Sequence, residues 1–176
     1  MCKHRENWVN IFWVDWQGQN TIEIVKRQKE VQNKKQDALQ HFQKALQLQP
    51  SLIEVYLKIG NLQIQFAGRN KEKLAIAKNT FLAGKERCSI DERLHCNLGF
   101  VELLLDNYAA AEKSLLEAVR LSPDYLLAWE NLWMVYYQTN ELVKAKKCLT
   151  EILRIQPEYP KKQELMRLSG GYRQNQ

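Results

Sequence analysis

Residues 111–123, AEKSLLEAVRLSP, and residues 145–157, AKKCLTEILRIQP, are variants of one phrase that recurs with a spacing of 34 residues. The phrase also occurs as ALQHFQKALQLQP over residues 38–50 and as AKNTFLAGKERCS over residues 77–89, where Ser89 takes the place of the proline. In every copy an alanine precedes a large apolar residue by four positions, and the closing residue follows eight positions later. A fixed period of this length indicates a repeat protein, in which each repeat is one supersecondary unit.

A second phrase stands upstream of three of these alanines and carries ring-bearing, aliphatic and small residues. Its members are Tyr56, Ile59 and Gly60, then His95, Leu98 and Gly99, then Trp129, Leu132, Trp133 and Tyr136. Both phrases place apolar residues at i, i+3, i+4 and i+7, so each unit is expected to hold two amphipathic helices. Turn-forming residues separate them, namely Gly68 and Asn70, Asp106 and Asn107, and Thr139 and Asn140. The small residues allow the two helices to cross closely, and the proline ends the second helix.

The two phrases together resemble the tetratricopeptide repeat, W-x2-L-G-x2-Y…A-x3-F…P with a period of 34 residues. The resemblance divides the chain into units at 19–52, 53–91, 92–125 and 126–159. The second unit has five extra residues, which we place near Ala67–Lys73 in the turn between its helices. The resemblance implies an all-α fold, a right-handed α-solenoid of stacked antiparallel helix pairs in a tetratricopeptide superhelix.

The two ends of this repeat array depart from the family pattern. In the first unit only the second half matches, so residues 21–36 form either a degenerate first helix or one long helix that continues through residues 37–49. In the last unit Trp133 stands where a small residue belongs, and its indole should push the helix pair apart or turn outward to pack elsewhere. Residues 160–169 are expected to form a terminal capping helix, followed by a polar tail at 170–176.

In the family, the first helix of each unit lines a concave groove that binds a peptide or a helix. The positions that correspond to this lining are Leu57, Asn61, Ile64, Arg93, Asn97, Phe100, Leu104, Leu127, Asn131, Met134 and Tyr137. The three asparagines either hold a ligand backbone through their amides or are ordinary helix-surface residues. Family members that clamp a terminal carboxylate need paired lysine and arginine here, and only Arg93 fits, so we expect no such clamp. The remaining lining is apolar and predicts an apolar peptide or helix as partner.

The N-terminal segment, residues 1–18, contains the sequence NWVNIFWVDW at residues 7–16. Drawn as a helix, it places Trp8, Phe12, Trp13 and Trp16 on one face. Three roles remain open for this aromatic helix. It caps the first end of the solenoid, it mediates homodimerisation or folds into the groove, or it lies in a membrane interface.

Composition and missing motifs limit the function classes. The chain has 176 residues, a net charge of +6 and 45% hydrophobic residues, which is typical of a folded globular protein. The basic excess lies in the first half and leaves RNA or an anionic membrane surface as an alternative ligand, less favoured than a protein. Four cysteines without a C-x-x-C pair, and no secretory signal, predict reduced thiols and a cytoplasmic location. Without a catalytic, metal or cofactor motif, we expect a non-enzymatic scaffold, adaptor or assembly factor that uses no cofactor.

Overall fold

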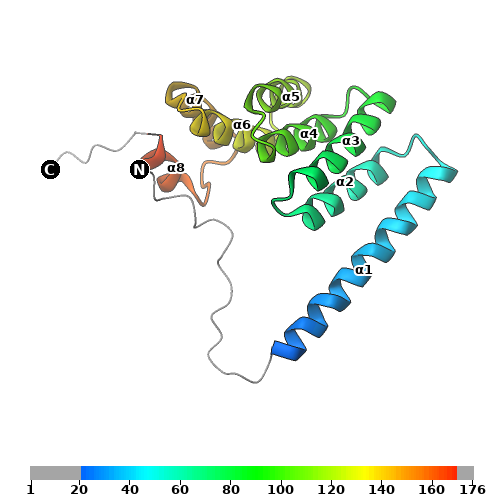
Figure 1. Ribbon diagram of the computed structural model, residues 1–176. Helices are drawn as coiled ribbons and strands as arrows, with labels where there is room; N and C mark the ends of the chain where they lie inside the picture. The colour runs from blue at the N-terminus through cyan, green and yellow to red at the C-terminus, as the bar shows by residue number, and fades with distance from the viewer. Residues whose placement is uncertain (1–20, 170–176) are drawn as a thin grey trace. The chain divides into compact units, whose positions relative to one another are not determined.

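The computed structural model describes residues 21–169, with side chains from residue 29 onward. This part of the chain holds eight helices and no strand, as predicted (Figure 1). The helices are α1 (Thr21–Leu48), α2 (Ile53–Ala67), α3 (Lys71–Arg87), α4 (Glu92–Leu104), α5 (Tyr108–Leu121), α6 (Leu126–Gln138), α7 (Leu142–Ile155) and α8 (Lys162–Leu168). The aromatic helix expected at residues 7–16 and the tail at 170–176 lie outside the described residues.

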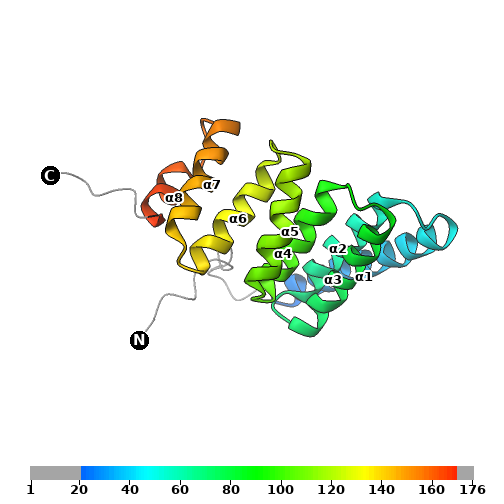
Figure 2. The same ribbon diagram turned by 90° about the horizontal axis from the view of Figure 1, so that it is seen from above.

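Three helix pairs follow one another from α2 to α7. Within each pair the two helices pack together, α3 packs on α4 and α5 packs on α6 (Figure 2). The first helices of the pairs, α2, α4 and α6, also contact one another in that order. This is the arrangement of a solenoid, in which each unit buries its apolar surface against its neighbours. The all-α solenoid predicted from the repeats is confirmed.

Glycine on the first helix allows the close crossing in two of the pairs. A Cβ atom at Gly60 would overlap the ring of Phe81, and one at Gly99 would lie 2.5 Å from Cγ of Leu115. Phe81 and Leu115 are both fully buried. The large residue of the second helix therefore fills the space that the glycine of the first helix leaves.

The placement of the five extra residues of the second unit in its turn is wrong. The turn between α2 and α3 has only the residues 68–70, and the corresponding turns at 105–107 and 139–141 are equally short. The helices are longer instead, since α2 has 15 residues and α3 has 17, whereas α4 has 13 and α5 has 14. Each turn contains a residue with positive φ, which is Gly68, Asp106 or Asn140.

Residues 21–48 form the single helix α1. The contacts divide the chain into two units after Ala38, and each is described by itself. In the first unit, the side chains from Lys29 to Gln32 are exposed, as expected for a polar helix. In the second unit, Leu46 packs against the buried cluster that contains Tyr56 and Phe81.

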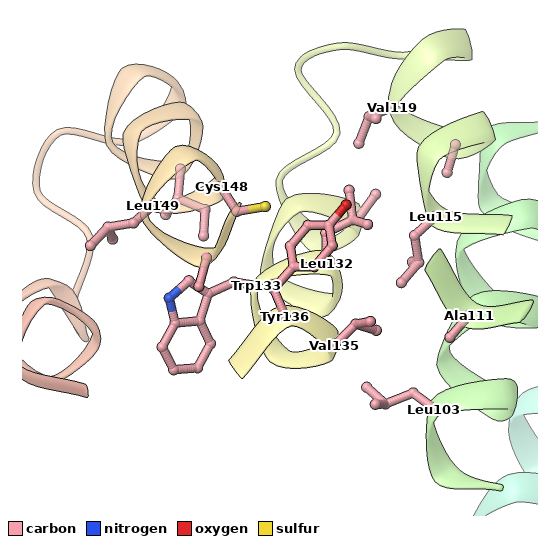
Figure 3. Packing of buried hydrophobic residues seen from close by; sticks show 14 of the residues in the cluster. Leu103, Ala111, Leu115, Val119, Leu132, Trp133, Val135, Tyr136, Cys148 and Leu149 are labelled. Carbon is pink, nitrogen blue, oxygen red and sulfur yellow. The ribbon is translucent and has the colours of Figure 1, made fainter. Parts of the chain in front are cut away.

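Trp133 is buried at the end of the array, with 5% of its surface exposed (Figure 3). Its indole Nε1–H donates a hydrogen bond to Oγ of Ser169 at 3.0 Å, and its ring stacks on Tyr137 with 5.1 Å between centroids. Leu165 of α8 is buried in the same cluster, and Leu168 packs against it. The indole thus packs on the segment that follows α7, where it provides a surface for the terminal helix.

Candidate functional site

The first helices α2, α4 and α6 hold the eleven residues that sequence predicts for partner binding, and the side of these helices that carries them is here named the first-helix face. Their exposure divides them into three groups. Leu57 and Asn131 are buried, and Asn61, Leu127 and Met134 are exposed. The half-buried residues are Ile64, Arg93, Asn97, Phe100, Leu104 and Tyr137.

The three asparagines have different surroundings. The amide of Asn131 is buried and donates to Sγ of Cys96 at 3.6 Å. The amide of Asn97 donates to the backbone carbonyl of Arg93 at 2.8 Å, one turn earlier on its own helix. Asn61 is exposed. Of the three amides, that of Asn61 is therefore the one presented to solvent.

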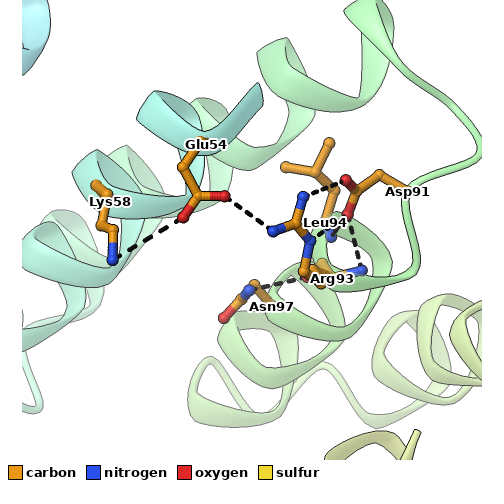
Figure 4. A network of polar contacts seen from close by, with 6 residues as sticks. All are labelled: Glu54, Lys58, Asp91, Arg93, Leu94 and Asn97. Atoms are coloured by element: carbon orange, nitrogen blue, oxygen red, sulfur yellow. Dashed lines mark hydrogen bonds and ion pairs between the residues drawn. The ribbon is translucent and has the colours of Figure 1, made fainter. Parts of the chain in front are cut away.

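Arg93 joins α4 to α2 through a network of polar contacts (Figure 4). Its guanidinium donates to Oε2 of Glu54 at 2.8 Å and to Oδ2 of Asp91 at 2.8 Å. Lys58 lies 3.9 Å from the other oxygen of Glu54. The cation that the sequence offers for a ligand is thus already paired with two carboxylates of this chain. Glu54 and Asp91 were not identified from the sequence as partners of Arg93. Asp91 could have been found, because an aspartate directly before a predicted helix is a typical N-cap.

Asp91 is the N-cap of α4. Its side chain accepts hydrogen bonds from the backbone N–H groups of Arg93 at 3.0 Å and Leu94 at 3.3 Å. Partial burial by itself would raise the pKa of the Asp91 carboxyl. The hydrogen bond and charge of Arg93, together with these backbone N–H groups, outweigh burial and hold its pKa below the ordinary value of 3.8.

We predict that Asp91→Asn destabilises the protein by about 1 kcal/mol at pH 7, because an amide caps the helix but forms no ion pair with Arg93. The carboxyl pKa is lower in the folded state, so its stabilising effect is complete well above pH 4 and disappears as the pH falls through 4 and below. Urea unfolding of both proteins at pH 7 and pH 3 should show that the difference shrinks at pH 3. Glu86→Gln, at an exposed carboxylate of α3, is the control. An equal difference at both pH values would contradict this assignment.

Apolar side chains form a patch across the first helices of the last two pairs. Leu127 is 44% exposed and Met134 is 42% exposed, both on α6. Phe100 and Leu104 on the neighbouring α4 are half-buried. Phe100 and Met134 are one repeat period apart, so they occupy equivalent positions on adjacent helices. We name these four residues the α4–α6 apolar patch.

Reactive groups are not concentrated on this face. Burial raises the pKa of the Cys96 thiol to about 12 and that of Cys148 to about 12, so both remain protonated at neutral pH. Nε2 of the buried His95 lies 2.8 Å from the carbonyl oxygen of Ser89. Between residues 21 and 169 no three His, Cys, Asp or Glu side chains form a group that could hold a metal ion. Within the same range, none of the helices combines the length and the hydrophobicity that a membrane span requires.

Comparison with known proteins agrees with the repeats and the fold. Residues 92–125 match the model of the tetratricopeptide repeat family. The chain is 28% identical over 82 residues to the uncharacterized protein ycf37 of Porphyra purpurea, a match that spans 47% of each, about half the length of that relative.

Solved structures with a similar fold were also found. The crystal structure of MamA is similar with a TM-score of 0.68 and 21% identity, over 81% of this chain and 80% of that one. The first tetratricopeptide domain of Spaghetti (RPAP3), bound to the HSP90 peptide SRMEEVD, has a TM-score of 0.60 and 22% identity. That match covers 67% of this chain and 93% of the other. This chain therefore carries a tetratricopeptide repeat at residues 92–125, and its described part has the fold of solved tetratricopeptide repeat structures.

Proposed function

We propose that this chain is a non-enzymatic scaffold or adaptor whose first-helix face binds an apolar peptide or helix of a partner protein. The observation that carries the proposal is the α4–α6 apolar patch. Leu127 and Met134 expose apolar surface to solvent on one well-packed helix. Exposed apolar side chains that lie close together are typical of sites that bind another protein.

The chemistry of the patch favours an apolar partner over a charged one. Arg93 and Glu54 neutralise each other on this face, so neither is free to select an opposite charge. Met134 has a flexible thioether side chain, which adapts to partners of different shape. An amphipathic helix that places its apolar side chains on the patch would use both properties.

The likeness to RPAP3 supports a protein partner in general, because its tetratricopeptide domain is bound to a peptide. A sequence identity of 22% indicates that the two proteins share a fold, but it does not indicate that they bind the same ligand. The acidic peptide SRMEEVD differs from the apolar partner proposed for this chain.

Affinity capture from a native extract tests the proposal. The bait would be the full chain, compared with the double variant Leu127→Glu/Met134→Glu. Both side chains are exposed, so the change adds charge to the patch without entering the core. The control is Ile76→Glu/Val143→Glu, which makes the same change at exposed apolar residues of α3 and α7. We expect the patch variant to lose most of the specific partners, because a charge replaces an apolar residue that would anchor the interface. The control should retain them. Loss in both variants, or in neither, would refute the proposal.

A further inference from the structure

A groove lies on the opposite side of the last two helix pairs, over the second helices α5 and α7. A cavity of about 430 Å³ is bounded by Leu116 of α5, by Trp129 and Tyr136 of α6, and by Lys144 and Lys147 of α7. An open surface of α5 that includes Lys113 adjoins this cavity at Leu116. We name the two together the α5–α7 groove.

The last pair differs from the preceding pair in sequence at its helix crossing. Trp133 occupies the position that Gly99 has in the preceding pair, and Figure 3 shows its indole between α6 and α7. Both α5 and α7 pack on α6, whose aromatic side chains form the floor between them. Leu116 is 45% exposed at the edge of this floor. The result is an apolar depression on a helix surface.

The charges around the groove are unbalanced. Its carboxylates are already paired, since Glu112 accepts from Tyr136 Oη at 2.8 Å and from Lys144 at 3.2 Å, and Glu117 binds Arg120 at 2.7 Å. Glu151 accepts from Arg154 at 2.7 Å.

Two lysines on the rim stand apart from these pairs. Lys113 on α5 and Lys147 on α7 form no ion pair with any residue in the described part of the chain. The groove therefore has an apolar floor and a net positive rim.

We propose that the α5–α7 groove binds an acidic peptide segment of a partner protein. One large apolar side chain of the segment enters the cavity against Trp129 and Tyr136, and neighbouring Asp or Glu side chains pair with Lys113 and Lys147. A buried apolar anchor surrounded by a polar rim is the usual arrangement of an interface hot spot. A volume of about 430 Å³ lies within the range of pockets that bind ligands in proteins. This second surface does not depend on the proposed role of the first-helix face.

Two short alanine-based helical peptides serve as probes, each with a central tryptophan. One carries glutamates three and four residues on either side, and the other carries lysines at the same positions. Fluorescence anisotropy of the labelled peptides, titrated with the full chain, measures binding at low and at physiological ionic strength. We expect the acidic peptide to bind and to weaken with salt, and the basic peptide not to bind. Equal binding of the two peptides, or binding of neither, would overturn the proposal.

Matched variants locate the site. Lys113→Glu/Lys147→Glu should weaken binding of the acidic peptide about tenfold, and Leu116→Ser, which removes apolar lining without adding a charge, should also weaken it. The control Lys146→Glu/Lys161→Glu makes the same charge change at exposed lysines that do not line the groove, and should stay within about twofold of the wild type. An equal loss in the control would show a non-specific charge effect and reject the groove.

Two further variants test whether the peptide binds elsewhere on the chain and whether the N-terminal segment occupies the groove. Met134→Glu, on the first-helix face, should leave binding of the acidic peptide unchanged, and a loss there would move the site to that face. Removal of residues 1–17 should also leave the affinity unchanged. A large gain in affinity would mean that the N-terminal segment of this chain occupies the groove, which contradicts an external partner.

Discussion

Replacement of Gly99 by valine is expected to destabilise the protein by about 3 kcal/mol, because the substituted side chain would enter the crossing of α4 and α5. A Cβ atom at this position would lie 2.5 Å from Cγ of Leu115 and 3.2 Å from the carbonyl oxygen of Ala111. Leu115 is fully buried and cannot move aside, so α5 would have to shift. Urea unfolding followed by circular dichroism measures the loss. Ala110→Val, an exposed position on α5, is the control and should cost less than about 1 kcal/mol.

A double-mutant cycle tests whether Leu115 is the cause. Gly99→Ala alone should destabilise, although alanine is the better helix former. Leu115→Ala alone should cost about 3 kcal/mol through the cavity it leaves. Because that change also removes the overlapping Cγ, the double variant should be at least as stable as Leu115→Ala alone. Additive losses would show that the contact between these two residues does not control the crossing.

Replacement of Trp133 by glycine is expected to cost about 4 kcal/mol, although it restores the small residue that the repeat pattern favours at this position. The indole is 5% exposed, stacks on Tyr137 and donates a hydrogen bond to Ser169. The variant would lose this packing and the hydrogen bond to Ser169, the residue that directly follows α8. Met134→Gly, one residue further along α6 and 42% exposed, makes the same backbone change and should cost only about 1 kcal/mol.

The difference between these two variants isolates the contribution of the indole. Unfolding free energies measured in urea, together with hydrogen exchange of α8 amides, provide the readout. We expect faster exchange of the α8 amides in Trp133→Gly and unchanged exchange in Met134→Gly. A Trp133→Gly variant as stable as the wild type would mean that the repeat pattern alone determines this position.

The repeat period predicted the three helix pairs from α2 to α7 because each unit packs mainly on its neighbours. Local spacing then carries most of the information about the fold. Gly60 and Gly99 could be assigned to helix crossings, because a residue without a side chain allows the second helix to approach closely. The five extra residues of the second unit were expected in its turn, but they lengthen α2 and α3. The length of a repeat does not reveal whether its turn or its helices contain the extra residues.

The candidate site was less accessible to sequence reasoning than the fold. Family positions indicate which residues belong to the first helices, but exposure depends on how adjacent units pack. Asn131 lies at such a position and is buried against Cys96. Arg93 is paired with Glu54, a residue 39 positions away, and no local pattern predicts that pairing. The opening of the α5–α7 groove depends on the combined positions of three helices, which a linear pattern of residues does not encode.

The central claim, that the first-helix face binds a partner protein, can be tested most directly by site-specific photo-crosslinking. The variant Met134→p-benzoylphenylalanine places the crosslinker on the α4–α6 apolar patch, and Ile76→p-benzoylphenylalanine places it on an exposed position of α3. Each full-length variant would be irradiated in a native extract, and the crosslinked peptides would be identified by mass spectrometry. We predict specific crosslinks to an apolar segment of a partner protein from position 134 and none from position 76. Crosslinks to the same partner from position 76, with none from position 134, would contradict the claim.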